Sequence, residues 1–78
     1  MKQQSPITAQ IRAAQLVAGN IARQKRLHNT TYETLAEVIN VSKGTMSNRM
    51  HNPSTFTLME LLLLARFFRI EIQELICG

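Results

Sequence analysis

The sequence predicts an all-α domain of five helices, in which a tight turn joins the second helix to the third and the first helix is extended. Three observations predict this class. No run alternates between apolar and polar residues as a half-buried strand would. Apolar residues recur at steps of three and four along several segments. Residues 31–52 hold two short helical patterns separated by turn-forming residues.

The first helix is predicted from Pro6 to about Leu27. Ser5 is a good N-cap, and proline suits the first helical position, where its missing N–H has no partner anyway. Residues 28–30 then break the helix. Its apolar face is expected to comprise Ile7, Ile11, Ala14, Ala18 and Ile21.

The second and third helices are predicted over 32–39 and 43–51. Thr31 and Ser42 are their expected N-caps, and Asn40 between them tolerates the left-handed conformation that ends a helix. Ala36 is small enough for two steeply crossing helices to approach closely. The buried contacts around it are expected from Leu35, Val41 and Met46.

The fourth helix is predicted to follow the turn at 52–55. Thr57 and Glu60 have the spacing of a capping box. Its expected buried face is Leu58, Leu61, Leu62, Ala65 and Phe68. A last helix over 71–76 is expected to turn Ile72, Leu75 and Ile76 inward.

The length of 78 residues predicts one domain. A single cysteine, Cys77, suits a reducing cytoplasm, and no secretory leader is recognised. The most apolar run, 61–65, is far too short to span a bilayer.

The net charge of +4 favours a polyanionic partner. Residues 1–52 hold seven basic and two acidic side chains, whereas residues 53–78 hold two basic and three acidic ones. The positive charge therefore accompanies the first two thirds of the chain, which include the two-helix turn, and not the C-terminal part.

The chain resembles the DNA-binding domain of lambdoid phage repressors and the Xre family over residues 17–76. The shared motifs are T-x-x-x-L-A at 31–36, V-S at 41–42, T-M-S at 45–47, N-P at 52–53, F-T-L-x-E-L at 56–61 and I-E-I-Q-E-L-I at 70–76. The resemblance implies a five-helix lambda-repressor-like fold with a helix-turn-helix over residues 17–78, preceded by an extension of the first helix over residues 1–16. It also implies a cytoplasmic, sequence-specific transcriptional regulator, a repressor of phage or mobile-element type, that binds double-stranded DNA.

The helix 43–51 would then enter the major groove, where side chains read base edges. The expected base contacts are Lys43, Gly44, Ser47, Asn48, Arg49 and His51. Phosphate contacts are expected at helix N-termini and in the following turn, where N–H groups and hydroxyls can face the backbone. They are Thr31, Tyr32, Ser42, Asn52, Ser54 and Thr55.

Four positions depart from the family pattern. Tyr32 stands where the family commonly has a glutamine that braces the recognition helix. Lys25 and Met50 occupy the positions of the family's usual ion pair, so that pair cannot form. Arg49 replaces an apolar residue, and Met50 is expected to supply the apolar contact instead. Gly44 lies inside a predicted helix, either for close backbone approach to DNA or simply because packing tolerates it.

A homodimer is expected, because a domain this small contacts few bases and two half-sites supply the missing affinity. The predicted dimer contacts are Ile7, Ile11, Ala14, Ile72 and Ile76. The first part of the long helix either forms this seam or packs back on the C-terminal helix.

Two other functions remain open from the sequence. One alternative to the regulator is a protein-interaction module that kept the fold but lost DNA binding. The other is an antitoxin that represses its own promoter. Enzymatic activity is not expected, because His28 and His51 lack aspartate or cysteine partners and the five acids are scattered glutamates. No cofactor, metal or small-molecule ligand is predicted.

Overall fold

The computed structural model describes the backbone of residues 6–77 and the side chains from Ile11 onward. It has five α-helices and one short 3-10 helix, and no strand occurs within residues 6–77, so the all-α prediction is confirmed for them. The elements are α1 (Pro6–Leu27), α2 (Tyr32–Val38), α3 (Lys43–His51), η1 (Pro53–Thr55), α4 (Leu58–Phe68) and α5 (Gln73–Ile76). The cap predicted at Ser5 lies outside the described residues.

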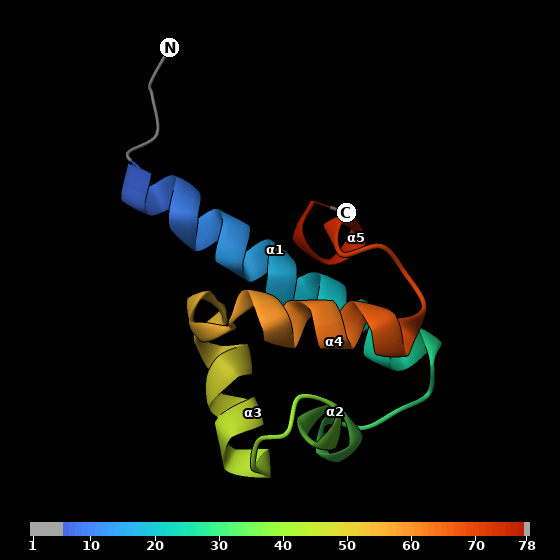
Figure 1. The fold of residues 1–78 in the computed structure, drawn as a ribbon. Coiled ribbons are helices and arrows are strands. Elements are labelled where there is room, and N and C mark those ends of the chain that lie inside the picture. The colour runs from blue at the N-terminus through green and yellow to red at the C-terminus, as the bar shows by residue number, and fades with distance from the viewer. Residues whose placement is uncertain (1–5, 78) are drawn as a thin grey trace.

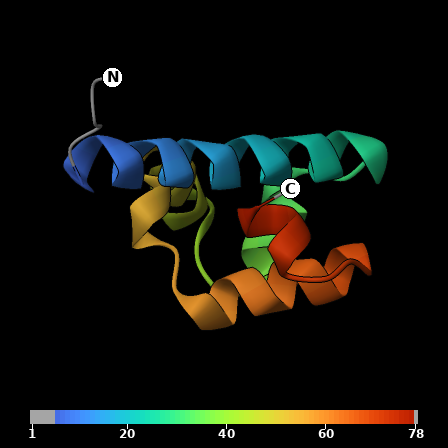
Figure 2. The same cartoon turned by 90° about the horizontal axis from the view of Figure 1, so that it is seen from above.

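Helix α4 runs across the middle of the molecule in Figure 1, and the view from above shows the long helix α1 and α4 on opposite sides (Figure 2). The short helix α5 packs against both. Helices α2 and α3 lie at the end of the molecule away from α5 (Figure 1). The N-terminal part of α1 projects beyond the body, and α1 runs without interruption through the predicted boundary between residues 16 and 17.

The core forms where α1, α2, α3, α4 and α5 meet. Its largest fully buried side chains are Ile21, Leu35, Met46, Leu64, Phe68 and Leu75. None of the described helices is long and apolar enough to cross a membrane.

The buried face of α1 differs from the predicted one. Ile11 is 53% exposed, and the side chain of Ile7 lies outside the described residues. The buried positions are Val17, Asn20, Ile21 and Gln24. Polar residues belong to this face because they can find partners there: Asn20 Nδ2 donates a buried hydrogen bond of 2.8 Å to the carbonyl oxygen of Leu75.

The buried face of α4 is also rotated from the prediction. Leu58 and Leu62 were expected inside but are 66% and 41% exposed. The capping box fixes Glu60 at the third helical position, where it is 8% exposed. The face that points inward is therefore Glu60, Leu61, Leu64, Ala65 and Phe68.

The last helix is shorter than predicted, because it begins at Gln73 rather than at residue 71. Leu75 is fully buried as expected, and Ile72 is partly buried against the core. Ile76 was expected inside but is 37% exposed. Before this helix, Arg69 ends α4 in the left-handed conformation with φ of 59°.

Candidate nucleic-acid interface

The turn between α2 and α3 has the predicted local structure. Asn40 is left-handed with φ of 61°, and the Val41 amide donates to the Ala36 carbonyl at 2.9 Å. The Ser42 hydroxyl caps α3 by accepting from the Thr45 amide at 3.0 Å. Thr31 caps α2 in the same way. Both predicted N-caps are confirmed, and these bonds anchor the start of α3 beside the end of α2.

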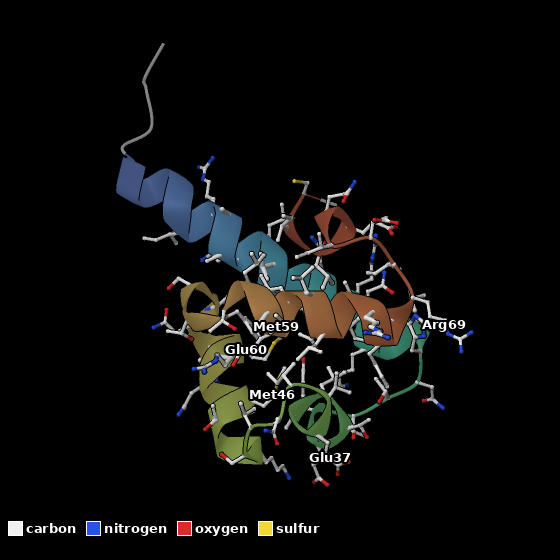
Figure 3. The ribbon with its side chains drawn as sticks, in the orientation of Figure 1. Glu37, Met46, Met59, Glu60 and Arg69 are labelled. Atoms are coloured by element: carbon white, nitrogen blue, oxygen red, sulfur yellow. The ribbon has the colours of Figure 1, made fainter. Side chains whose placement is uncertain are left out.

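One side of α3 is buried and the other is polar and exposed. Met46 is fully buried, and Ala36 of α2 is 3% exposed. Figure 3 labels Met46 in the space between α3 and α4. Five of the predicted base-contacting residues are exposed on the free side of α3. They are Lys43, Gly44, Ser47, Asn48 and His51.

A groove of about 420 Å³ borders this exposed side of α3. It is lined by Tyr32, Lys43, Ser47, Met50 and His51. A second groove of about 240 Å³ lies between α1 and the end of α3. It is lined by Ile11, Ala14, Gln15, His51, Asn52, Pro53 and Ser54. His51 lines both grooves, and its ring Nδ1 lies 2.8 Å from the Ser47 carbonyl oxygen.

Lys43 is paired with an acid at the start of α2. Its Nζ donates to Glu33 Oε1 at 2.8 Å, and both side chains are largely exposed. This hydrogen bond, together with the attraction between the charges, raises the pKa of Lys43 and lowers that of Glu33. Because solvent screens an exposed pair, Lys43 can exchange Glu33 for another anion at small cost.

Arg49 points away from the exposed side of α3, although the sequence predicted that it contacts bases. Its Nε and Nη2 donate to the two carboxylate oxygens of Glu60 at 3.0 and 3.2 Å. The side chains are 24% and 11% exposed. Arg49 therefore joins α3 to the start of α4, and we remove it from the set of candidate base contacts.

The pKa of Glu60 reflects two opposing influences. Burial raises this pKa, but hydrogen bonds from Arg49 and from the Thr57 backbone, with the charge of Arg49, outweigh burial and lower it. The ionised carboxylate therefore stabilises the fold at neutral pH. This contribution is lost as the pH falls through the lowered pKa of Glu60.

Tyr32 and Lys25 contact each other, although the sequence did not predict this contact. The Lys25 ammonium lies 4.8 Å from the centre of the Tyr32 ring, within the range of a cation–π interaction. Tyr32 is partly buried against the core, as is Met50. The apolar contact predicted for Met50 is therefore confirmed.

Five of the six residues predicted to contact phosphates, all except Tyr32, take part in local hydrogen bonds. Thr31 and Ser42 accept from backbone amides as caps. In the turn after α3, the Ser54 hydroxyl donates to Asn52 Oδ1 at 3.1 Å, and the Thr55 hydroxyl donates to the Asn52 carbonyl at 2.7 Å. All five are exposed and lie at the N-terminal ends of α2 and α3 or just beyond α3.

Gly44 has no packing requirement for glycine. A Cβ built at this residue would meet only Ser42 Oγ at 3.9 Å, which is an ordinary contact. The protein itself therefore leaves open space beside the backbone of the first turn of α3.

The predicted dimer residues occupy different environments. Ile11 and Ile76 are exposed, Ala14 is half-buried, and Ile72 packs against its own core. The most exposed apolar side chains of α4 are Leu58, Met59 and Leu62, and two of them, Leu58 and Leu62, were predicted to be buried.

Sequence reasoning missed Glu33 and Glu60 as partners of the α3 cations. The Arg49–Glu60 pair spans 11 residues across a turn, so no helical spacing indicates it.

In the described residues, no three histidine, cysteine or acidic side chains are grouped so that they could hold a metal ion. No protein-family model, curated protein or solved structure significantly matches the chain.

Proposed function

We propose that the chain is a sequence-specific DNA-binding transcriptional regulator with a lambda-repressor-like helix-turn-helix formed by α2 and α3. The observation that carries this proposal is the exposed polar side of α3. Lys43, Ser47 and Asn48 project from one short helix that is held from behind by Met46. An α-helix of this kind fits the major groove, and its side chains can then reach base edges.

Two further features support the proposal. The net charge of residues 1–52 is +5, all of it from α1 and the residues before it, and Lys25 of α1 lies beside Tyr32 at the start of α2. The groove of about 420 Å³ lined by Tyr32, Lys43 and His51 lies beside the exposed side of α3, where a sugar-phosphate backbone would pass. With one strand in this groove, Lys43 exchanges Glu33 for a phosphate, and Asn48 faces the bases, where an amide pairs with adenine.

We further propose that two copies bind two half-sites, since one α3 reads only a few base pairs. The exposed Leu58, Met59 and Leu62 on α4 are consistent with association, because soluble monomers seldom expose contiguous apolar side chains. Selection of bound sequences from random duplexes tests this part. A palindromic consensus is expected, and a consensus without symmetry contradicts the dimer.

The decisive experiment is an anisotropy titration with generic and selected duplexes over a series of salt concentrations. Each phosphate neutralised by a cation contributes a slope of about −0.9 to log K against log salt. We expect measurable binding at low salt and a steep loss of affinity as salt rises. Absence of binding at low salt overturns the proposed function and favours a protein-interaction module.

Glu33→Gln is expected to raise the affinity for generic duplex by about fivefold at low salt. The substitution removes a negative charge beside the groove and frees Lys43, which Glu33 holds at 2.8 Å in the unbound protein. The same titration measures the change. Glu71→Gln changes the net charge equally in the connection before α5, and an equal gain in this control would show that the Lys43–Glu33 pair has no specific role.

A further inference from the structure

The end of α3 is fixed to the start of α4 by a two-pronged ion pair. The Arg49 guanidinium donates one hydrogen bond to each carboxylate oxygen of Glu60, at 3.0 and 3.2 Å. This fork-to-fork geometry constrains both distance and angle, which a single charge contact does not. Figure 3 shows Glu60 where α4 begins, beside α3.

Glu60 is itself held rigidly. Its Oε1 also accepts a hydrogen bond of 3.0 Å from the Thr57 amide, and the Glu60 amide donates to Thr57 Oγ1 at 3.1 Å. These reciprocal bonds form a capping box that fixes the carboxylate to the backbone of α4. Arg49 is therefore attached to a rigid point of the body rather than to a mobile side chain.

The other attachments of α3 are less directional. Met46 and Met50 pack into or against the core, but methionine side chains are flexible and adapt to small rotations of a helix. The Lys43–Glu33 pair at the opposite end of α3 is exposed, and such pairs constrain geometry weakly. The turn to α2 anchors the start of α3, and beyond that turn the Arg49–Glu60 pair is thus the most directional attachment of α3.

We propose that Arg49 and Glu60 are positioning residues that set the angle at which α3 presents Ser47 and Asn48 to DNA, and so determine sequence specificity. This inference rests on the DNA-binding function proposed above. Base-edge hydrogen bonds require defined geometry, whereas attraction to phosphates tolerates small displacements. Loosening α3 therefore lowers the preference for the selected sequence more than it lowers general DNA affinity.

Glu60→Gln tests this inference directly. Glutamine at the third helical position preserves the capping box, but it removes the charge and one of the two acceptor oxygens offered to Arg49. We expect the ratio of selected-site to generic affinity to fall by about tenfold, the equivalent of losing one good base contact. The charge-matched control Glu71→Gln is expected to leave this ratio unchanged.

Variants of Arg49 separate positioning from charge. Arg49→Lys keeps the charge but loses the fork, and we expect a reduced ratio with little change in generic affinity. The double variant Arg49→Met/Glu60→Gln is expected to reduce the ratio no further than Arg49→Met or Glu60→Gln alone. Each single variant already disrupts the Arg49–Glu60 pair, so the two effects do not add. An unchanged ratio in these variants, measured well below their unfolding temperatures, overturns the inference.

A measurement without DNA distinguishes failure of this inference from failure of the proposed function. Residual dipolar couplings of backbone amides report the angle between α3 and α4 in solution. We expect the couplings of α3 to change relative to those of α4 in Glu60→Gln and to remain as in the wild type in Glu71→Gln. Unchanged couplings in Glu60→Gln overturn the positioning role, whether or not the wild type binds duplex DNA.

Discussion

Asn48→Asp is expected to lower the affinity for the selected duplex on the order of a hundredfold. The substitution replaces an amide by a carboxylate of nearly the same shape on the exposed side of α3. Asparagine both donates to and accepts from adenine, whereas an ionised carboxylate only accepts and also repels the phosphates. The selected and generic duplexes are titrated by anisotropy at the same salt concentration.

The control for this prediction is Gln73→Glu, which adds one negative charge to α5 at the opposite end of the molecule from α3. It is expected to weaken binding only slightly, since a distant exposed charge is screened. A similar loss of affinity in both variants would mean that net charge, and not a contact of Asn48, causes the effect. Circular dichroism checks that both variants remain folded.

Phe68→Ala is expected to lower the free energy of unfolding by about 3–5 kcal/mol. Phe68 is 1% exposed at the end of α4. The centre of its ring lies 5.2 Å from the centre of the His28 ring and 5.5 Å from the centre of the Phe67 ring. Truncation leaves a cavity between α4 and the end of α1. A domain of this size has a total stability of about 4–12 kcal/mol, so much of it would be lost.

Phe67→Ala is the matched control for that prediction, because it removes the same side chain one residue earlier. Phe67 is 39% exposed, so we expect a loss of about 1 kcal/mol. Urea unfolding followed by circular dichroism measures both values. Equal losses would contradict the position of Phe68 in the core.

Local signals in the sequence were enough to predict most of the helices. The caps at Thr31, Ser42 and Thr57 depend on hydrogen bonds within three residues, and all three are confirmed. The bounds of α1 and α3 also agree with the prediction, because proline at Pro6 and the cap at Ser42 act on the adjacent backbone.

Tertiary contacts explain what the sequence did not predict. Apolar periodicity placed Leu58 and Leu62 inside, yet the wholly apolar run in α4 offered several possible faces, and the capping box selected the one containing Glu60. Likewise, nothing in the sequence indicated that Asn20 would be buried, because its partner is a backbone carbonyl 55 residues away.

In the candidate interface too, local signals predicted some side-chain positions, whereas tertiary contacts decided others. The exposed positions of α3 follow from its helical period once Met46 is taken as buried. The direction of Arg49 does not follow from that period, since a long side chain at the edge of a helix can turn either way. An acid from another helix decided the outcome.

The hydrogen bond between Asn20 and Leu75 also has a consequence for the order of folding. It closes a loop that contains most of the chain, and α5 packs against α1 and α4. During synthesis the inner face of α1 emerges from the ribosome first, whereas the helix that covers part of it emerges more than 50 residues later. Nascent chains arrested before α5 are therefore expected to remain protease-sensitive, and protection to arise only when the last helix has left the exit tunnel.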